Sequence, residues 1–166
     1  MGAGVLRRGE KGNEKNARNV QAGNKMKGKH SSETLQSGVI PYRIQDGKLE
    51  VMIVTTSSHK SWTIPKGNIA KGMTASESAA KEAYEEAGIR GEIVRPNIGF
   101  YNYEKHSKKF KVKVFLLEVT EILAEWPEYL SRKRRWSSIR KAHKKVGHIQ
   151  LKDMLVHLEQ NFEILP

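Results

Sequence analysis

The most constraining feature of the sequence is a helix predicted between Thr74 and Gly88. Thr74 and Glu77 form a capping-box pattern, in which each side chain accepts a backbone N–H at a helix start. Gly88 is the residue type that most often ends a helix in a left-handed conformation. Between these signals, the apolar positions are mostly alanines, at 79, 80, 83 and 87. Because alanine is small, we expect this helix to pack closely against a sheet through one face.

Alternating apolar residues predict the strands of this sheet. The pair Asp46-Gly47 is a strong hairpin signal and joins a strand around 39–44 to one around 49–53. Further strands are predicted over 62–64, 92–101 and 110–120 and at 136, helices over 138–146 and 151–162, and a loop over 121–135. This order predicts an α+β domain with a mixed sheet between helices.

The first 36 residues differ in composition from the rest. They are rich in Gly, Asn, Lys and Ser and hold few large apolar residues, so they cannot bury enough surface to offset the entropy of ordering. We therefore expect a disordered basic tail over 1–36 and a folded domain over 37–166. The tail is either a solvated extension or an electrostatic arm for a polyanion.

Charge and residue usage restrict the partners and the chemistry. The chain has 30 Lys and Arg against 18 Asp and Glu, and the net charge of +12 favours polyanions such as nucleotides, polyphosphates, nucleic acid or an anionic membrane. The absence of cysteine excludes disulfides, thiolate metal sites and cysteine nucleophiles. No apolar run approaches the roughly 20 residues of a spanning helix, so we expect a cytoplasmic protein with no membrane partner.

Three glutamates form the candidate catalytic cluster. Glu82, Glu85 and Glu86 lie at positions i, i+3 and i+4 of the predicted helix, so their carboxylates project from one side, opposite the alanines. Three converging carboxylates suit Mg²⁺ or Mn²⁺, which are hard ions that prefer oxygen ligands. The alternative is an acidic face that is only solvated, because glutamate is a good helix former.

The residues around these glutamates resemble the Nudix box, G-x5-E-x7-R-E-U-x-E-E-x-G-U. Its defining positions are occupied here by Gly67, Glu82, Ala83, Glu85, Glu86, Gly88 and Ile89. Met73 and Lys81 depart from it, since they stand where the family has Glu and Arg. Those two positions resemble a structural ion pair in the family, and losing both leaves no uncompensated charge. We expect Met73 to pack on the Lys81 side chain instead.

The resemblance covers about residues 37–158 and narrows to one branch of the family. The segments 61–67, 99–101, 112–126, 132–136, 139 and 142 look like the diphosphoinositol polyphosphate phosphohydrolases, a branch that also cleaves diadenosine polyphosphates. Pro65-Lys66-Gly67 looks more like the diadenosine polyphosphate hydrolases, because the inositol enzymes tend to carry Pro-Gly-Gly. The resemblance implies the Nudix α/β/α sandwich, with its mixed β-sheet between helices.

The family also implies roles for the site residues. A metal ion would be held by the Gly67 carbonyl, Glu82 and Glu86, with Glu85 completing the cluster, and either Glu86 or Glu85 would be the general base. Candidates for a further acid outside the box are Glu104, Glu118 and Glu121. Cations that would bind substrate are Arg43, Lys60, Lys66, Lys105, Lys108, Lys109, Arg132, Arg134 and Arg135, of which Lys105, Lys108 and Lys109 are expected in a loop. A basic run is also typical of a solvated face or a nucleic-acid patch.

The sequence therefore predicts a pyrophosphohydrolase that depends on Mg²⁺ or Mn²⁺ and acts on a phosphorylated small molecule, either a diphosphoinositol polyphosphate or a dinucleoside polyphosphate. Two alternatives stay open. One is a Nudix hydrolase of a smaller nucleotide such as ADP-ribose or of a capped RNA end. The other is a non-catalytic polyanion-binding module with a degenerate box. Nucleic acid is allowed as a partner but not favoured, and the sequence gives no oligomeric state.

Overall fold

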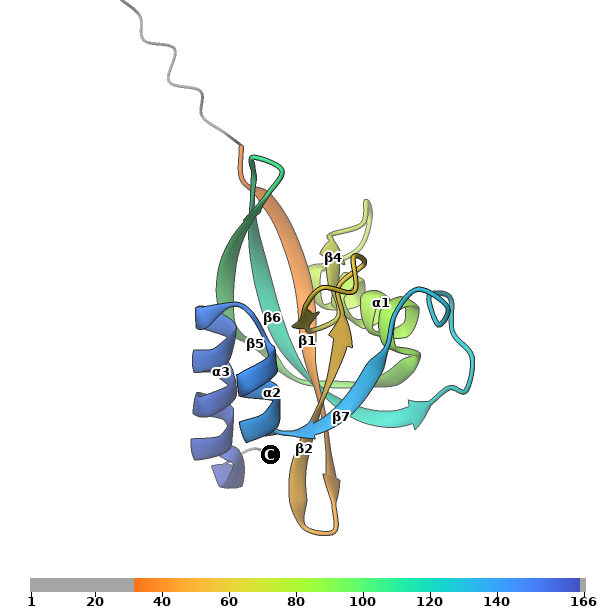
Figure 1. Cartoon of the computed structure of the whole chain (residues 1–166), viewed down its shortest axis with the longest axis vertical. Coiled ribbons are helices and arrows are strands. Elements are labelled where there is room, and N and C mark those ends of the chain that lie inside the picture. The colour runs from red at the N-terminus through yellow and green to blue at the C-terminus, as the bar shows by residue number, and fades with distance from the viewer. Residues whose placement is uncertain (1–31, 165–166) are drawn as a thin grey trace, which may run out of the picture. The chain divides into compact units, whose positions relative to one another are not determined.

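The chain folds in the order strands, helix, strands, helices (Figure 1). The computed structural model describes residues 32–164, so most of the predicted tail lies outside the described residues. The elements are β1 (Thr34–Gln45), β2 (Lys48–Thr55), β3 (Trp62–Thr63), β4 (Lys66–Asn68), α1 (Ala75–Ala87), β5 (Ile89–Lys105), β6 (Lys108–Ile122), β7 (Arg134–Ser138), α2 (Ile139–Lys145), α3 (Ile149–Gln160) and a 3₁₀ turn (Phe162–Ile164).

The strands form a mixed sheet centred on β1. The order is β3-β2-β1-β6-β5, while β4 pairs with β1 and β7 pairs with β2. β1 and β2 form the predicted antiparallel hairpin, in which Gln45 lies opposite Lys48. β1 and β6 run parallel, and the other named strand pairs are antiparallel.

Helix α1 forms where the sequence predicts it. Thr74 Oγ1 accepts the N–H of Glu77 at 3.2 Å, and Glu77 Oε2 accepts the N–H of Thr74 at 2.7 Å. Gly88 ends the helix with a φ of 61°, a left-handed conformation that favours glycine. The buried alanines at 79, 83 and 87 pack against the sheet. This packing fixes the orientation of α1 and therefore the positions of its glutamates.

Each face of the sheet has its own apolar core. On one face, the alanines of α1 pack with Val39, Met52 and Leu117. On the other face, Leu151 and Leu155 of α3 pack with residues of the sheet such as Ile40, together with Ile139 of α2. The predicted α+β class and α/β/α sandwich are therefore confirmed. Among the described residues, no helix is both long and apolar enough to cross a membrane.

Among the element boundaries that differ from the prediction, three affect the predicted tail and loops. β1 begins at Thr34, so residues 34–36 belong to the sheet and not to the tail. The loop expected between residues 101 and 110 is a two-residue turn, His106 and Ser107, both with positive φ. Lys105 and Lys108 are therefore strand residues that pair with each other. β7 begins at Arg134, which places the last residues of the predicted loop in the sheet.

Candidate active site

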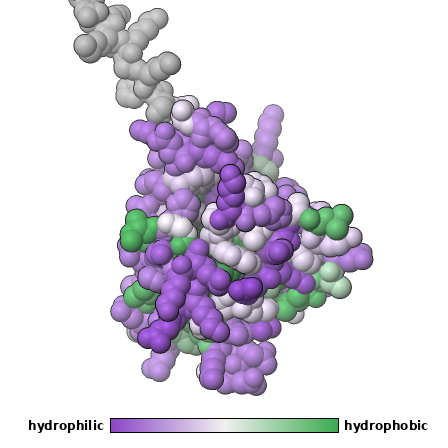
Figure 2. Space-filling model, viewed as in Figure 1, coloured by the Kyte–Doolittle hydropathy of each residue, from purple (hydrophilic) through white to green (hydrophobic). Residues whose placement is uncertain are grey.

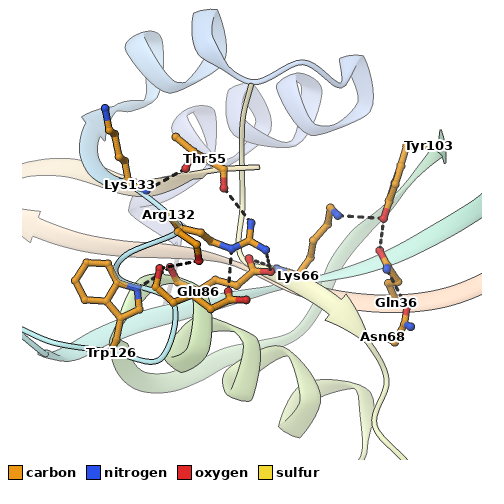
Figure 3. A network of polar contacts seen from close by, with 11 residues as sticks. Gln36, Thr55, Lys66, Asn68, Glu86, Tyr103, Trp126, Arg132 and Lys133 are labelled. Carbon is orange, nitrogen blue, oxygen red and sulfur yellow. Dashed lines mark hydrogen bonds and ion pairs between the residues drawn. The ribbon is translucent and has the colours of Figure 1, made fainter. Parts of the chain in front are cut away.

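Glu86, near the C-terminus of α1, is the most buried carboxylate of the predicted cluster (Figure 3). Its Oε1 lies 3.0 Å from Arg132 Nη2, and its Oε2 accepts the backbone N–H of Lys66 at 3.2 Å. Burial raises the pKa of Glu86 to about 8, although the Arg132 charge opposes this shift. A carboxyl group with this environment titrates close to neutral pH, which is typical of functional sites.

Glu82 lies one helical turn before Glu86 and contacts Gly67 in β4. A Cβ atom at residue 67 would collide with the Glu82 carboxylate, so only glycine leaves room for it here. Burial, and then the charge of Glu85, raise the pKa of Glu82. In this chain, the need for space beside the Glu82 carboxylate therefore explains why the first position of the Nudix box is glycine.

Glu85 has a different environment from its two neighbours. Its carboxylate lies 2.8 Å from Lys81 Nζ, in an i, i+4 ion pair on the surface of α1. Lys81, one of the two departures from the box, thus has an acidic partner within its own helix. Met73, the other departure, exposes 41% of its surface. The predicted packing of Met73 on the Lys81 side chain stays a prediction.

The three carboxylates do not converge as the sequence suggested. Over residues 32–164, no three acidic or histidine side chains gather at metal-binding distance. The reason is that each carboxylate has its own neighbour: Arg132, Lys81 or the Gly67 backbone. The donor set nevertheless fits a divalent cation, because Glu82 and Glu86 offer carboxylate oxygens close to Gly67, where no side chain covers the backbone.

Arg132 links the site to the segment between β6 and β7. Its Nε donates to Glu128 Oε2 at 2.8 Å and its Nη1 donates to the Thr55 carbonyl at 2.9 Å. The same segment contacts the end of α1, since Trp126 Nε1 donates to the Glu86 carbonyl at 3.0 Å. Arg132 was predicted as a substrate-binding cation, and the structure brings it to the most buried glutamate.

Arg134 lies away from the carboxylates, in contrast to its predicted role. Its Nη1 donates to the Ala87 carbonyl at 2.7 Å, and its Nη2 donates to the Leu123 carbonyl at 2.7 Å. The guanidinium also stacks 3.9 Å from the centre of a Trp126 ring. The first bond satisfies a carbonyl at the C-terminus of α1, and the second joins this end of the helix to the segment that follows β6. Arg134 therefore has a structural role, and we do not count it among the cations that bind substrate.

A pocket of about 260 Å³ lies beside Lys66. Lys66 Nζ donates to the Tyr103 hydroxyl at 3.1 Å, and burial lowers the pKa of this lysine while Glu86 opposes the shift. The pocket combines cations, rings and hydroxyls; its walls include Thr56, Ser61, Trp62, Lys66, Tyr103, Lys105 and His148. The aromatic side chains were not predicted as site residues. For Tyr103, the period-two alternation of β5, which places it on the same face as the buried Tyr101, is a signal that could have indicated it.

The other predicted cations are spread over the surface. Arg43 pairs with Glu50 at 2.7 Å in the first hairpin, and Lys108 and Lys109 are exposed at the start of β6. Lys60 is exposed in the turn before β3, and Arg135 is exposed on β7. Of the candidate acids outside the box, Glu104 lines the pocket, Glu118 is exposed on β6 and Glu121 pairs with Arg90 at 3.1 Å. Among the described contacts, three of the nine predicted cations reach the carboxylates or line the pocket: Lys66, Lys105 and Arg132.

A comparison with protein families identifies the class of this fold and site. Residues 34–158 match the model of the NUDIX domain. The chain therefore belongs to the Nudix family, and the predicted enzyme class, a Nudix pyrophosphohydrolase, is confirmed. Enzymes of this family generally use a divalent metal ion such as Mg²⁺.

Individual relatives confirm the predicted branch. Nudix hydrolase 16, mitochondrial, of Arabidopsis thaliana is 35% identical over 140 residues, which are 74% of this chain and 77% of that protein. Diphosphoinositol polyphosphate phosphohydrolase 2 of Rattus norvegicus is 35% identical over 98 residues, 57% of this chain and 53% of that protein. The chain thus spans about half the length of the rat relative. The crystal structure of C. elegans Ap4A hydrolase has the same fold, with a TM-score of 0.67 and 22% identity over 79% of this chain and 99% of that one.

Proposed function

We propose that this chain hydrolyses a diphosphate linkage in a highly phosphorylated small molecule, with Mg²⁺ or Mn²⁺ as its cofactor. The observation that carries the proposal is the position of Glu86. Its buried carboxylate lies between Arg132 and the Lys66 backbone, and the Lys66 side chain leads into a pocket of about 260 Å³. A reactive carboxylate, flanking cations and a neighbouring pocket are what cleavage of a phosphate anhydride requires.

Glu82, Glu86 and the Gly67 backbone are the groups that would hold the metal ion, with Glu85 available once it leaves Lys81. When bound, the ion neutralises charge on the diphosphate and lowers the pKa of the attacking water. Glu85 and Glu86 are the two candidates for the general base that accepts the water proton.

The phosphates of the substrate would contact Lys66, Lys105 and Arg132. Arg132 suits this role because a guanidinium can bind two phosphate oxygens at once. The rings of Trp62, Tyr103 and His148 in the pocket suit a planar base, which a dinucleoside polyphosphate has and an inositol ring has not. We therefore favour a dinucleoside polyphosphate, and the diphosphoinositol polyphosphates, named in the rat relative, are the second candidate.

Incubation with a panel of substrates tests the proposal. The purified chain is mixed with diadenosine tetraphosphate, a diphosphoinositol polyphosphate, ADP-ribose or a cap dinucleotide, and the products are separated by anion-exchange chromatography. We expect the highest kcat/KM for diadenosine tetraphosphate, no product in EDTA and recovery on adding Mg²⁺. Faster cleavage of ADP-ribose or of the cap contradicts the substrate class. No turnover of any compound favours the non-catalytic alternative.

The location in the cell is a separate prediction. The sequence predicts a cytoplasmic protein, while the Arabidopsis thaliana relative is named as mitochondrial. Microscopy of the full chain with a C-terminal fluorescent tag checks this, and co-localisation with a mitochondrial marker contradicts the cytoplasmic prediction.

A further inference from the structure

The basic residues of the chain are concentrated in one segment. Residues 129–152 contain nine Lys and Arg and no Asp or Glu, whereas the other residues contain 21 Lys and Arg and 18 Asp and Glu. Most of the net charge of +12 therefore comes from the segment that includes β7 and α2. Arg132 and Arg134 are used inside the fold. The other cations of this segment have no such role.

The alternation of β7 sends its two arginines to opposite faces of the sheet. Arg134 turns toward the C-terminus of α1, and Arg135 lies on the α2 side, where its guanidinium is 5.2 Å from the centre of the Trp62 ring. Lys145 Nζ, at the end of α2, lies 5.9 Å from the same ring. Trp62 is therefore a point at which cations from β7 and α2 meet.

Helix α2 extends this cationic region. Ile139 and Ala142 are buried against the sheet, so the other side of the helix faces outward. The exposed cations there, together with Arg135, are named the α2 cationic surface: Arg135, Arg140, Lys141, Lys144 and Lys145. Within residues 32–164, none of the five makes an ion pair. In the view of Figure 2, hydrophilic side chains predominate over the part of the molecule formed by α2 and α3.

The α2 cationic surface is continuous with the pocket beside Lys66. Trp62 lines this pocket, and the cationic groups of Arg135 and Lys145 lie over its ring. A backbone bridge joins Trp62 to Val146, the residue that follows α2. The pocket itself contains the rings of Tyr103 and His148, whose centres are 5.5 Å apart. A chain of phosphates on α2 can therefore place a planar group in the pocket.

We propose that the α2 cationic surface binds single-stranded nucleic acid, with phosphates on its cations and one base in the aromatic pocket. Release of counterions from the phosphates supplies the affinity, and aromatic rings stack on a base whatever its identity. An anionic bilayer is flat and has no group that enters the pocket, and a duplex keeps its bases inside the helix. A flexible single strand uses both the charges and the pocket.

Fluorescence anisotropy with a short 5′-labelled RNA tests this surface in the full chain. The buffer contains EDTA, so hydrolysis makes no contribution and a negative result leaves the proposed function standing. The test variant is Lys141→Gln/Lys144→Gln. The control Lys71→Gln/Lys113→Gln removes the same charge on the α1 side of the sheet, from the turn before α1 and from β6. We expect about tenfold weaker binding for the α2 variant only, and a salt slope reduced by about 1.4, since each single-strand phosphate contact contributes about 0.7.

Three results overturn the proposal, provided that circular dichroism shows both variants folded. Equal loss in the α2 variant and the control means that net charge alone attracts RNA. Equal affinity for a duplex of the same sequence means that no base enters the pocket. Binding to phosphatidylserine vesicles that is lost in the α2 variant, with no matching loss for the RNA, assigns the surface to a membrane.

Discussion

The guanidinium of Arg132 lies 3.0 Å from the Glu86 carboxylate, and both side chains are nearly buried, with 13% and 6% of their surface exposed. The arginine comes from the segment before β7, and the glutamate comes from the Nudix box on α1. Because Glu86 is also a proposed metal ligand, Arg132 balances a negative charge that a bound divalent cation would also balance. The pair would therefore couple the proposed metal site to the β6–β7 segment.

Arg132→Gln tests this coupling. At pH 8.5, above the pKa of about 8, the Arg132 charge favours the ionised form of Glu86, and removing one partner of a buried ion pair costs about 3 kcal/mol. We expect the unfolding free energy to fall by that amount in EDTA and to recover in part with Mn²⁺, which replaces the missing charge. Urea denaturation measures the loss, and Mn²⁺ titration by electron paramagnetic resonance measures the affinity. The control is Lys133→Gln, an exposed neighbour. The same loss with and without Mn²⁺ contradicts the coupling.

The raised pKa of Glu86 predicts how stability changes with pH in the metal-free protein. Between about pH 4.5 and 8, the folded state keeps a proton on Glu86 that the unfolded chain releases, so the unfolding free energy decreases as the pH rises. We expect a decrease of about 5 kcal/mol that levels off above pH 8. His148, whose pKa burial lowers, acts in the opposite direction below pH 6.5. The difference between wild type and Glu86→Gln in EDTA isolates the Glu86 contribution, and a difference that is constant with pH contradicts it.

Gly67→Ala tests whether metal binding and activity depend on the position of the Glu82 carboxylate. The added Cβ collides with this carboxylate, so Glu82 must move away from β4. A shift of about 1 Å in a reacting group can lower activity about 100-fold. We expect a loss of this size in kcat/KM together with weaker Mn²⁺ binding. Gly147→Ala is the matched control for Mn²⁺ binding, because its Cβ meets no atom within 4 Å. Unchanged Mn²⁺ affinity in Gly67→Ala means that Glu82 is not a ligand.

Arg134→Ala distinguishes a structural residue from a substrate-binding one. The guanidinium donates to three carbonyls around the end of α1, and hydrogen bonds from a charged group contribute more than neutral ones. We expect a loss of about 3 kcal/mol in urea denaturation, with little change in the KM of the folded enzyme. Arg135→Ala, from the other face of β7, should change stability by less than about 0.5 kcal/mol. A raised KM at unchanged stability in Arg134→Ala restores its predicted role.

Local signals explain how much of the fold could be predicted. The Asp46-Gly47 turn, the capping box at Thr74 and the stop at Gly88 each act within a few residues, and all three form as predicted. The turn at His106 and Ser107 was missed because neither residue is glycine or asparagine, although both have positive φ. The long hairpin of β5 and β6 is fixed by strand pairing, which overrides the weak turn signal.

The sequence predicted which residue types form the candidate site better than it predicted which residues contact one another there. The spacing of the box places Glu82 and Glu86 correctly on one side of α1, because it depends only on helical geometry. The sequence of the basic run at 132–135 did not indicate which of its cations binds substrate and which has a structural role. Their roles depend on where β7 begins: Arg132 precedes the strand and reaches Glu86, while Arg134 and Arg135 alternate across it. That separation is a property of the folded sheet.

The most direct measurement for the whole proposal is the turnover of Glu86→Gln in saturating Mg²⁺, with the best substrate of the panel. The substitution keeps the shape of the side chain and removes its charge, so it affects both a metal ligand and a candidate base. We expect kcat to fall about 1,000-fold, with circular dichroism unchanged, while the exposed Glu92→Gln on β5 keeps wild-type activity. Undiminished hydrolysis by folded Glu86→Gln contradicts the assignment of this carboxylate as the centre of the active site.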